Sequence, residues 1–340
     1  MKIRQLAILA AGSAILALTS VVADAKVSLR FGHVNGYGEV AADLFQEFAD
    51  RVRERTAGEV DIKVFPAGQL GKEIELVQQA KLGGVDITAP SMPAAAAVLP
   101  SLEVPSTPFL WDDWDQARAV IEGEAMQPVW DELESKHNLI PLAKTWYWGW
   151  RNMTLREKAV TKPEDVANLK IRTPEQTVWV EMIKALGGVP TPVPFADVYV
   201  ALQQKLVDGQ ENPIPTIYSR RFFEVQGYLV MTRHMLQNNM ILINKSVFER
   251  LTPRFQRIVL EEARAASARN TLLQQSHEKA MLKAMRDSGK IQVIDNPDRA
   301  AFAAKTASVP DALQAHWGAA NIKRVRDAIA KLTAQGQVKK

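Results

Sequence analysis

The 340-residue sequence predicts an α/β fold divided between two lobes. Strand and helix patterns alternate over residues 27–88, which is typical of an open α/β sheet. A second strand–helix unit begins near residue 169, and the chain is longer than one domain of ordinary size. A run of helix-forming residues over 253–288 is unusually long for a globular domain, and a helix of that length could bridge two lobes.

The first 25 residues have the pattern of a secretory signal peptide. Lys2 and Arg4 precede a short apolar run over 6–18, and residues 23–25 form an A-x-A cleavage site. We therefore expect export and cleavage after about Ala25. The alternative is a membrane anchor, but the apolar run is too short to span a bilayer comfortably.

Apolar periodicity and turn residues predict the individual elements. Apolar residues recur at helical spacing over 40–52, and they alternate over 60–64 as in a half-buried strand. Residues 146–151 are predicted to form an aromatic segment that crosses between the lobes. The remaining expected elements are strands at 27–33, 85–88, 169–172 and 240–244, helices at 72–81, 178–186 and 197–206, and a proline-rich turn at 189–194.

The composition argues against several classes of function. The chain has no cysteine, so it has neither a disulfide framework nor a thiolate metal site. Its 42 Lys and Arg residues are interspersed with 38 Asp and Glu residues, and the net charge of +4 does not indicate nucleic acid as a partner. The five histidines show no metal-ligand spacing, and no P-loop, GxSxG or dinucleotide motif is present. We therefore expect no cofactor, no metal site and no catalytic residues.

Three side chains, each within two residues of a proline, indicate a pocket for a small organic anion. Arg172 ends an apolar strand, and arginine pairs bidentately with a planar carboxylate. Phe195 offers an apolar wall, and Asn212 offers both a donor and an acceptor. Each residue has a plainer interpretation: a surface salt bridge for the arginine, core packing for the phenylalanine, and a turn before proline for the asparagine.

The densest aromatic cluster of the chain leads directly to Arg151. Trp146, Tyr147, Trp148 and Trp150 fall within five residues. Aromatic walls beside a cation suit a flat or ring-bearing acid, but they suit an ordinary core between two lobes as well. The residues alone leave these alternatives open.

Taken together, these features resemble the DctP-type substrate-binding proteins of TRAP (tripartite ATP-independent periplasmic) transporters. The matching strings follow the order of that family across nearly the whole chain after the leader, and the Asp-Gly-Gln-Glu-Asn-Pro string is highly specific to it. The strings lie at residues 31–33, 65–71, 169–172, 190–195, 198–199, 201–203, 207–213 and 223–226.

The resemblance implies a type II-like periplasmic-binding-protein fold with a cleft between two lobes and a long helix that spans both. Lobe 1 would comprise residues 26–147 and 236–275, and lobe 2 would comprise residues 148–235 and 276–300. Residues 301–340 would form a helical segment that packs across the lobes.

The resemblance also implies roles for individual residues. Arg172 would pair with the substrate carboxylate, Arg151 and Asn212 would assist, and Phe195 would pack on the ligand. Ser91 and Ala94 replace charged residues of the sialic-acid-binding branch, which argues against sialic acid. The further candidates are Trp148, Trp150 and Trp179 as walls of the pocket, and Asn35, Glu175, Gln176, Asn238 and Asn239 as partners of ligand hydroxyls.

These expectations describe a monomeric periplasmic protein that captures a small carboxylate and delivers it to TRAP membrane subunits. A sugar acid such as a hexuronate or an aldonate suits the polar candidates, whereas a keto acid or an aromatic acid would use the tryptophans. Two other classes stay open: a ligand receptor for a membrane sensor kinase, and a two-lobed enzyme.

Overall fold

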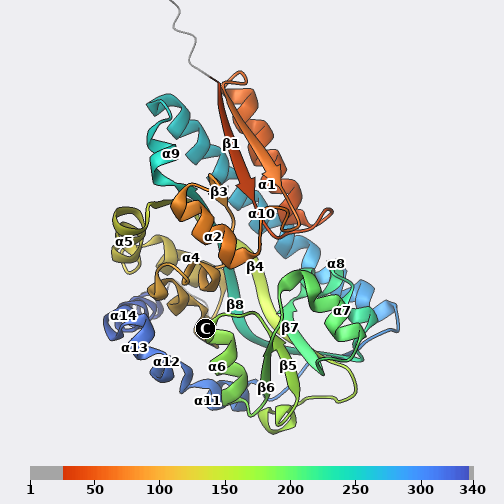
Figure 1. Cartoon of the computed structure of the whole chain (residues 1–340). Helices are drawn as coiled ribbons and strands as arrows, with labels where there is room; N and C mark the ends of the chain where they lie inside the picture. Colours follow the sequence, from red (N-terminus) through yellow and green to blue (C-terminus); the bar gives the residue numbers. More distant parts are fainter. Residues whose placement is uncertain (1–25, 337–340) are drawn as a thin grey trace, which may run out of the picture.

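The computed structural model describes residues 26–336, so the predicted signal peptide lies outside the described residues. These residues form a mixed sheet with the strand order β2-β1-β3-β8-β4-β7-β5-β6, and β9 pairs with β8 (Figure 1). The strands are β1 (Val27–Gly32), β2 (Val60–Phe65), β3 (Ile87–Thr88), β4 (Leu139–Leu155), β5 (Lys170–Thr173), β6 (Val189–Pro192), β7 (Gly209–Pro213), β8 (Tyr228–Asn244) and β9 (Gln292–Ile294).

Two long antiparallel strands, β4 and β8, join the two ends of the sheet. Each has 17 residues and would extend about 55 Å at the usual rise per residue of a strand. The parallel strands β1 and β2 lie beyond one edge of this pair, and the parallel strands β5 and β6 lie beyond the other. Four register shifts interrupt the β4–β8 ladder, and such irregularities bend a strand and increase its twist.

The sequence prediction was wrong about the extent of these two strands. Residues 146–151 belong to β4, and the strand expected at 240–244 begins at Tyr228. Buried polar residues such as His234 and Asn238 interrupt the apolar pattern of β8. Because both faces of the strand are covered, no polar–apolar alternation marks its course.

The first third of the chain supplies β1, β2 and β3 and the helices packed near them. Leu44, Phe45, Phe48 and Val52 form the buried stripe of α1, as their helical spacing predicts. The expected helix at 72–81 is α2. The helical elements in this part are α1 (Val40–Arg55), α2 (Glu73–Leu82), α3 (Met92–Ala95), the 3-10 helix η1 (Pro100–Ser106), α4 (Trp114–Glu122) and α5 (Gln127–His137).

The second α/β unit contains β5, β6 and β7. The helix expected at 178–186 is α6, whereas the one expected at 197–206 is shorter, and the proline-rich segment at 189–194 contains β6 rather than only a turn. The helical elements in this part are η2 (Pro163–Val166), α6 (Thr177–Ala185), η3 (Phe195–Asp197), α7 (Val198–Gln203), α8 (Ile214–Ser219) and η4 (Phe222–Glu224), and α9 (Lys245–Glu249) follows β8.

The predicted long helix is confirmed as α10 (Pro253–Asp287). The hydroxyl of Thr252 accepts the backbone N–H of Phe255, and proline occupies the first helical position, so the helix begins where the sequence indicates. Its 35 residues correspond to about 52 Å. The helix packs against α1 and β4 and also contacts α8 (Figure 1), so it touches both parts of the fold.

Four helices follow β9: α11 (Arg299–Thr306), α12 (Val309–Ala312), α13 (Gln314–Trp317) and α14 (Ala319–Ala334). They contact α4, η1 and α6, which come from different parts of the chain. The side chain of Glu103 fixes this arrangement: it accepts the Trp317 indole N–H at 2.8 Å and also the Thr177 hydroxyl at 2.7 Å. The boundaries proposed for the two lobes stay a prediction. None of the helices between residues 26 and 336 has the length and apolar composition needed to cross a membrane.

Candidate functional site

A cavity of about 360 Å³ lies where the first third of the chain meets the second α/β unit. It is bounded by the segment after β1, the start of α2, and the segments that follow β5 and β6. The residues that line it are Val34, Asn35, Ala67, Gly68, Gly71, Lys72, Glu73, Ile74, Glu75, Ser91, Trp148, Arg151, Arg172, Pro174, Glu175, Gln176, Trp179, Val193, Pro194, Phe195, Ala196, Asp197, Asn212, Gln237 and Asn239.

Three neighbouring strands bring the predicted anchors together. β4 pairs with β7 so that Arg151 lies opposite Pro213, next to Asn212. β7 pairs in turn with β5, with Arg172 opposite Gln210. The two arginines and the asparagine, which are far apart in the sequence, therefore line one cavity.

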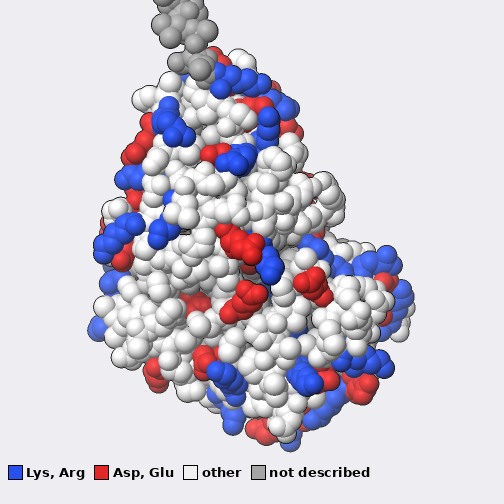
Figure 2. Space-filling model, viewed as in Figure 1, with Lys and Arg blue, Asp and Glu red and all other residues white. Residues whose placement is uncertain are grey.

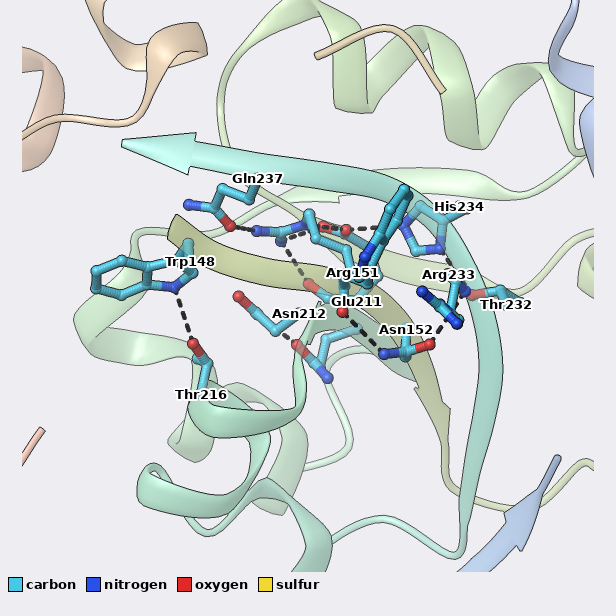
Figure 3. A network of polar contacts seen from close by, with 12 residues as sticks. Trp148, Arg151, Asn152, Glu211, Asn212, Thr216, Thr232, Arg233, His234 and Gln237 are labelled. Atoms are coloured by element: carbon cyan, nitrogen blue, oxygen red, sulfur yellow. Dashed lines mark hydrogen bonds and ion pairs between the residues drawn. The ribbon is translucent and has the colours of Figure 1, made fainter. Parts of the chain in front are cut away.

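Four of the five N–H groups of Arg151 donate to protein partners (Figure 3). Its Nε and Nη2 donate to the carboxylate of Glu211, and Nη2 also donates to the Glu211 backbone oxygen at 2.6 Å. Its Nη1 donates to the side-chain oxygen of Gln237, and its guanidinium lies 4.9 Å from the ring centroid of Trp179. Arg151 is thus held rigidly and neutralised, which leaves it little capacity to carry the charge of a ligand.

Glu211, the partner of Arg151, is itself held by a hydrogen-bond chain through His234 and Thr232. His234 Nε2 lies 3.1 Å from Glu211, and the Thr232 hydroxyl lies 2.7 Å from His234 Nδ1. Burial lowers the pKa of His234 despite the nearby carboxylate, so the ring is neutral, donates through Nε2 and accepts from Thr232 at Nδ1. Burial tends to raise the pKa of Glu211, but Arg151 and the hydrogen bond from His234 hold it below its usual value. The pair is therefore charged at neutral pH.

Arg172 has no such carboxylate partner among residues 26–336. Only 2% of its surface is exposed, and its Nε and Nη2 both donate to the backbone oxygen of Val193, at 2.9 and 2.6 Å. Burial lowers the pKa of Arg172 to about 9, while Glu211 raises it and Arg151 lowers it further. At that value the guanidinium remains charged at neutral pH. A buried cation without a directly bonded carboxylate is costly, and the carboxylate of a ligand can supply that bond.

The segment after β6 and the segment after β1 form opposite walls of the cavity. Phe195 lines it in η3, and the guanidinium of Arg220 lies 4.6 Å from the centroid of the Phe195 ring. Arg220 also pairs with Glu39 at 2.7 Å and donates to the Val34 backbone oxygen at 3.2 Å. Glu39 in turn accepts the side-chain N–H of Asn35 at 3.0 Å. Arg220 therefore connects the wall after β6 to the segment after β1.

The structure separates the three candidate tryptophans. Trp148 and Trp179 line the cavity, and the Trp148 indole N–H donates to the Thr216 hydroxyl at 3.1 Å (Figure 3). Trp150 does not line it: its ring packs in the core on the other side of β4, with the guanidinium of Arg233 5.0 Å from its centroid. The prediction that Trp150 narrows the pocket does not agree with this placement.

Most of the predicted polar candidates also line the cavity, namely Asn35, Ser91, Asn212, Glu175, Gln176 and Asn239. Asn238 does not, because its amide bonds the backbone at Trp146 and Lys144. Sequence reasoning missed Glu73 and Gln237. Glu73 begins α2 and accepts the backbone N–H of Ser91 at 2.7 Å, so it brings a carboxylate to the cavity beside Ser91. Acidic residues are common in the first turn of any helix, so nothing in the sequence distinguished this one.

Binding is expected to change the fluorescence of Trp148 and Trp179, because both indoles line the cavity. Trp148→Phe and Trp179→Phe should each remove part of the change that a ligand induces. Trp150→Phe is the matched control from the same strand and should leave the change intact. Fluorescence titration of the three variants tests this, and loss of most of the signal in the Trp150 variant would contradict the placement.

No group of His, Cys, Asp and Glu suited to a metal ion occurs within the described residues. The family model described as bacterial extracellular solute-binding protein, family 7 (DctP), matches residues 31–316. The chain belongs to this family. The DctP family consists of solute-binding proteins, which confirms the predicted recognition and the prediction that the chain is not an enzyme.

Two relatives in the DctP family and one solved structure illustrate the similarity. The 2,3-diketo-L-gulonate-binding periplasmic protein YiaO of Escherichia coli is 31% identical over 304 residues, 89% of this chain and 91% of that protein. The C4-dicarboxylate-binding periplasmic protein DctP of Rhodobacter capsulatus is 31% identical over 321 residues, 93% and 95% of the two chains. A TRAP periplasmic solute-binding protein of Actinobacillus succinogenes with bound L-galactonate has a TM-score of 0.84 and 28% identity, covering 90% of this chain and 100% of that one.

Proposed function

We propose that this protein captures a small hydroxylated carboxylic acid, such as a hexuronate or an aldonate, and delivers it to the membrane subunits of a TRAP transporter. It would act in the periplasm after removal of the predicted signal peptide. The observation that carries the proposal is the buried guanidinium of Arg172, which has no carboxylate partner among the described residues. A ligand carboxylate would supply the missing charge in the two-pronged geometry that arginine favours.

Polar atoms around the rest of the cavity favour a ligand with hydroxyl groups. The indole N–H of Trp179 and the side-chain oxygen of Gln176 have no hydrogen-bond partner within residues 26–336. Hydroxyls both donate and accept, so a polyhydroxy acid can satisfy both groups. The relatives named for 2,3-diketo-L-gulonate and L-galactonate bind acids of this kind.

Binding would proceed by closure of the two sides of the cavity around the acid. One side is the first third of the chain, and the other is the second α/β unit. Ligand contacts to both sides exist only when the sides are together, so the ligand shifts the population toward the closed state. The pair formed by Arg220 and Glu39 joins the two sides beside the cavity, and we expect it to help hold the closed state.

Arg220→Gln is expected to weaken binding by about 1 kcal/mol, the upper range for a partly exposed ion pair. The loss should appear as faster dissociation, because the pair stabilises the closed state rather than the first encounter. Stopped-flow kinetics measures this. Arg221→Gln is a matched control, since Arg221 pairs with Glu224 on the exposed surface. If Arg220→Gln and Arg221→Gln changed the dissociation rate of the ligand equally, Arg220 would have no specific role in closure.

A thermal-shift screen of hexuronates, aldonates, keto acids and aromatic acids tests the proposed function. A ligand at about one hundred times its dissociation constant should stabilise the protein by roughly 2.7 kcal/mol. We expect the largest shifts from hydroxylated acids and no shift from the corresponding uncharged alditols. Stabilisation by alditols as strong as that by acids would contradict the proposal.

A further inference from the structure

Charged side chains line the cavity unevenly. The carboxylates are those of Glu73, Glu75, Glu175 and Asp197, and the cations are those of Lys72, Arg151 and Arg172. Glu211, outside the cavity lining, already neutralises Arg151. The lining therefore carries more negative than positive charge before a ligand enters. Acidic atoms are also visible around the middle of this face of the molecule (Figure 2).

None of these four carboxylates has a cationic partner within residues 26–336, and Glu75 accepts only the backbone N–H of Lys72. The hydrogen-bond partner of Glu73 is the neutral residue Ser91, whose backbone N–H it accepts at 2.7 Å. Glu73 and Glu175 are close enough to Arg172 to raise its pKa. Burial raises the pKa of Glu73, against the influence of the Ser91 N–H and the two arginines. A ligand held by Arg172 would thus have carboxylates beside its other atoms.

We propose that these carboxylates restrict the site to acids with a single negative charge, so that hydroxylated monocarboxylates bind and the matching dicarboxylates are excluded. The inference rests on the proposed function, in which one ligand carboxylate pairs with Arg172. A cavity of about 360 Å³ has room for both ends of a small acid, so the second carboxylate of a dicarboxylate would lie among the lining residues. It would meet Glu73 and Glu175, and like charges brought together in a binding site oppose binding strongly. A hydroxyl at the same place instead donates to them.

The difference would separate this chain from the relative named for C4-dicarboxylates, although the two are 31% identical. Overall similarity at that level does not fix the charge of the ligand, because a few side chains around the cavity decide it. The identity of the residues at positions 73, 175 and 197 is therefore more informative here than the family itself.

The test is calorimetric titration with matched pairs of acids that differ by oxidation of one terminal carbon. The probes are D-galactonate against galactarate, D-erythronate against meso-tartrate, and D-glucuronate against D-glucarate. For each pair with measurable binding, we expect the monocarboxylate to bind at least about tenfold more tightly, about 1.4 kcal/mol. Glu73→Gln keeps an acceptor for the Ser91 N–H and removes the charge, so it should narrow this preference. Glu181→Gln, on the surface of α6 beside Lys184, is the control and should leave the preference unchanged.

The outcomes distinguish the inference from the proposed function. Dicarboxylates that bind as tightly as their monocarboxylate partners would overturn the inference and leave the carboxylate-binding function standing. A preference that Glu73→Gln does not narrow would overturn the assigned cause. If no acid of any pair binds and none in the wider thermal-shift screen does, the proposed function itself fails, and the inference fails with it.

Discussion

Arg172→Ala is expected to weaken binding of the acid by about 2–5 kcal/mol, the range observed when one partner of a buried, hydrogen-bonded charge pair is truncated. The ligand carboxylate would then lose its buried cation, and Arg151 could not replace it, because it is engaged by Glu211 and Gln237. Arg172→Lys should restore only part of the affinity, since an ammonium cannot match the two-pronged geometry. Calorimetry of the acid with the largest thermal shift measures both effects.

A different substitution of Arg172 should have the opposite effect on the protein without ligand. Arg172 is buried without a counter-ion, so Arg172→Met, which keeps much of the side-chain volume, should not lower the free energy of unfolding of the ligand-free protein. Urea denaturation checks this. Near-wild-type affinity in the Ala variant, or severe destabilisation of the Met variant, would show that Arg172 serves the fold rather than the ligand.

Glu211→Gln is expected to destabilise the fold by about 3–5 kcal/mol, because it leaves the guanidinium of Arg151 buried without its counter-charge. The double variant Arg151→Met with Glu211→Leu removes both charges and should recover much of the loss. Urea denaturation of the single and double variants measures the difference. If Glu211→Gln alone hardly changed the free energy of unfolding, the pair between Arg151 and Glu211 would not be important for the stability of the fold.

The Glu211 substitution should also change the response to acid. The pKa of Glu211 is held below its usual value, so the pair contributes stability that is present above the unfolded pKa of glutamate, about 4.3. That contribution is lost as the pH falls through the lower pKa of the folded state. Glu211→Gln should therefore lose stability less steeply than the wild type over this acid range.

The sequence indicated residues that line the cavity, but not that the two arginines would have different partners. Arg151, Arg172 and Asn212 all line the cavity, as their motifs indicate. Which arginine is free depends on Glu211, a residue of β7 that lies 60 positions from Arg151. No local pattern reveals such a pairing, because it follows from the register of β4 against β7.

The misplacement of Trp150 has a local physical cause. Trp148 and Trp150 have the same parity on one strand, so simple alternation puts them on the same face. Gly149 lies between them with a φ of +120°, and the β4–β8 register shifts between Tyr147 and Gly149. This irregularity turns Trp150 into the core and brings Arg151 to the cavity beside Trp148. The sequence shows the glycine but not the bend.

A crystal structure of the complex would show directly whether Arg172 holds the carboxylate of the ligand. The protein should be crystallised with the acid that gives the largest thermal shift. We expect a carboxylate within hydrogen-bonding distance of Arg172, with the pair between Arg151 and Glu211 intact. An acid bound with its carboxylate on any other group, and Arg172 still bonded only to Val193, would contradict it.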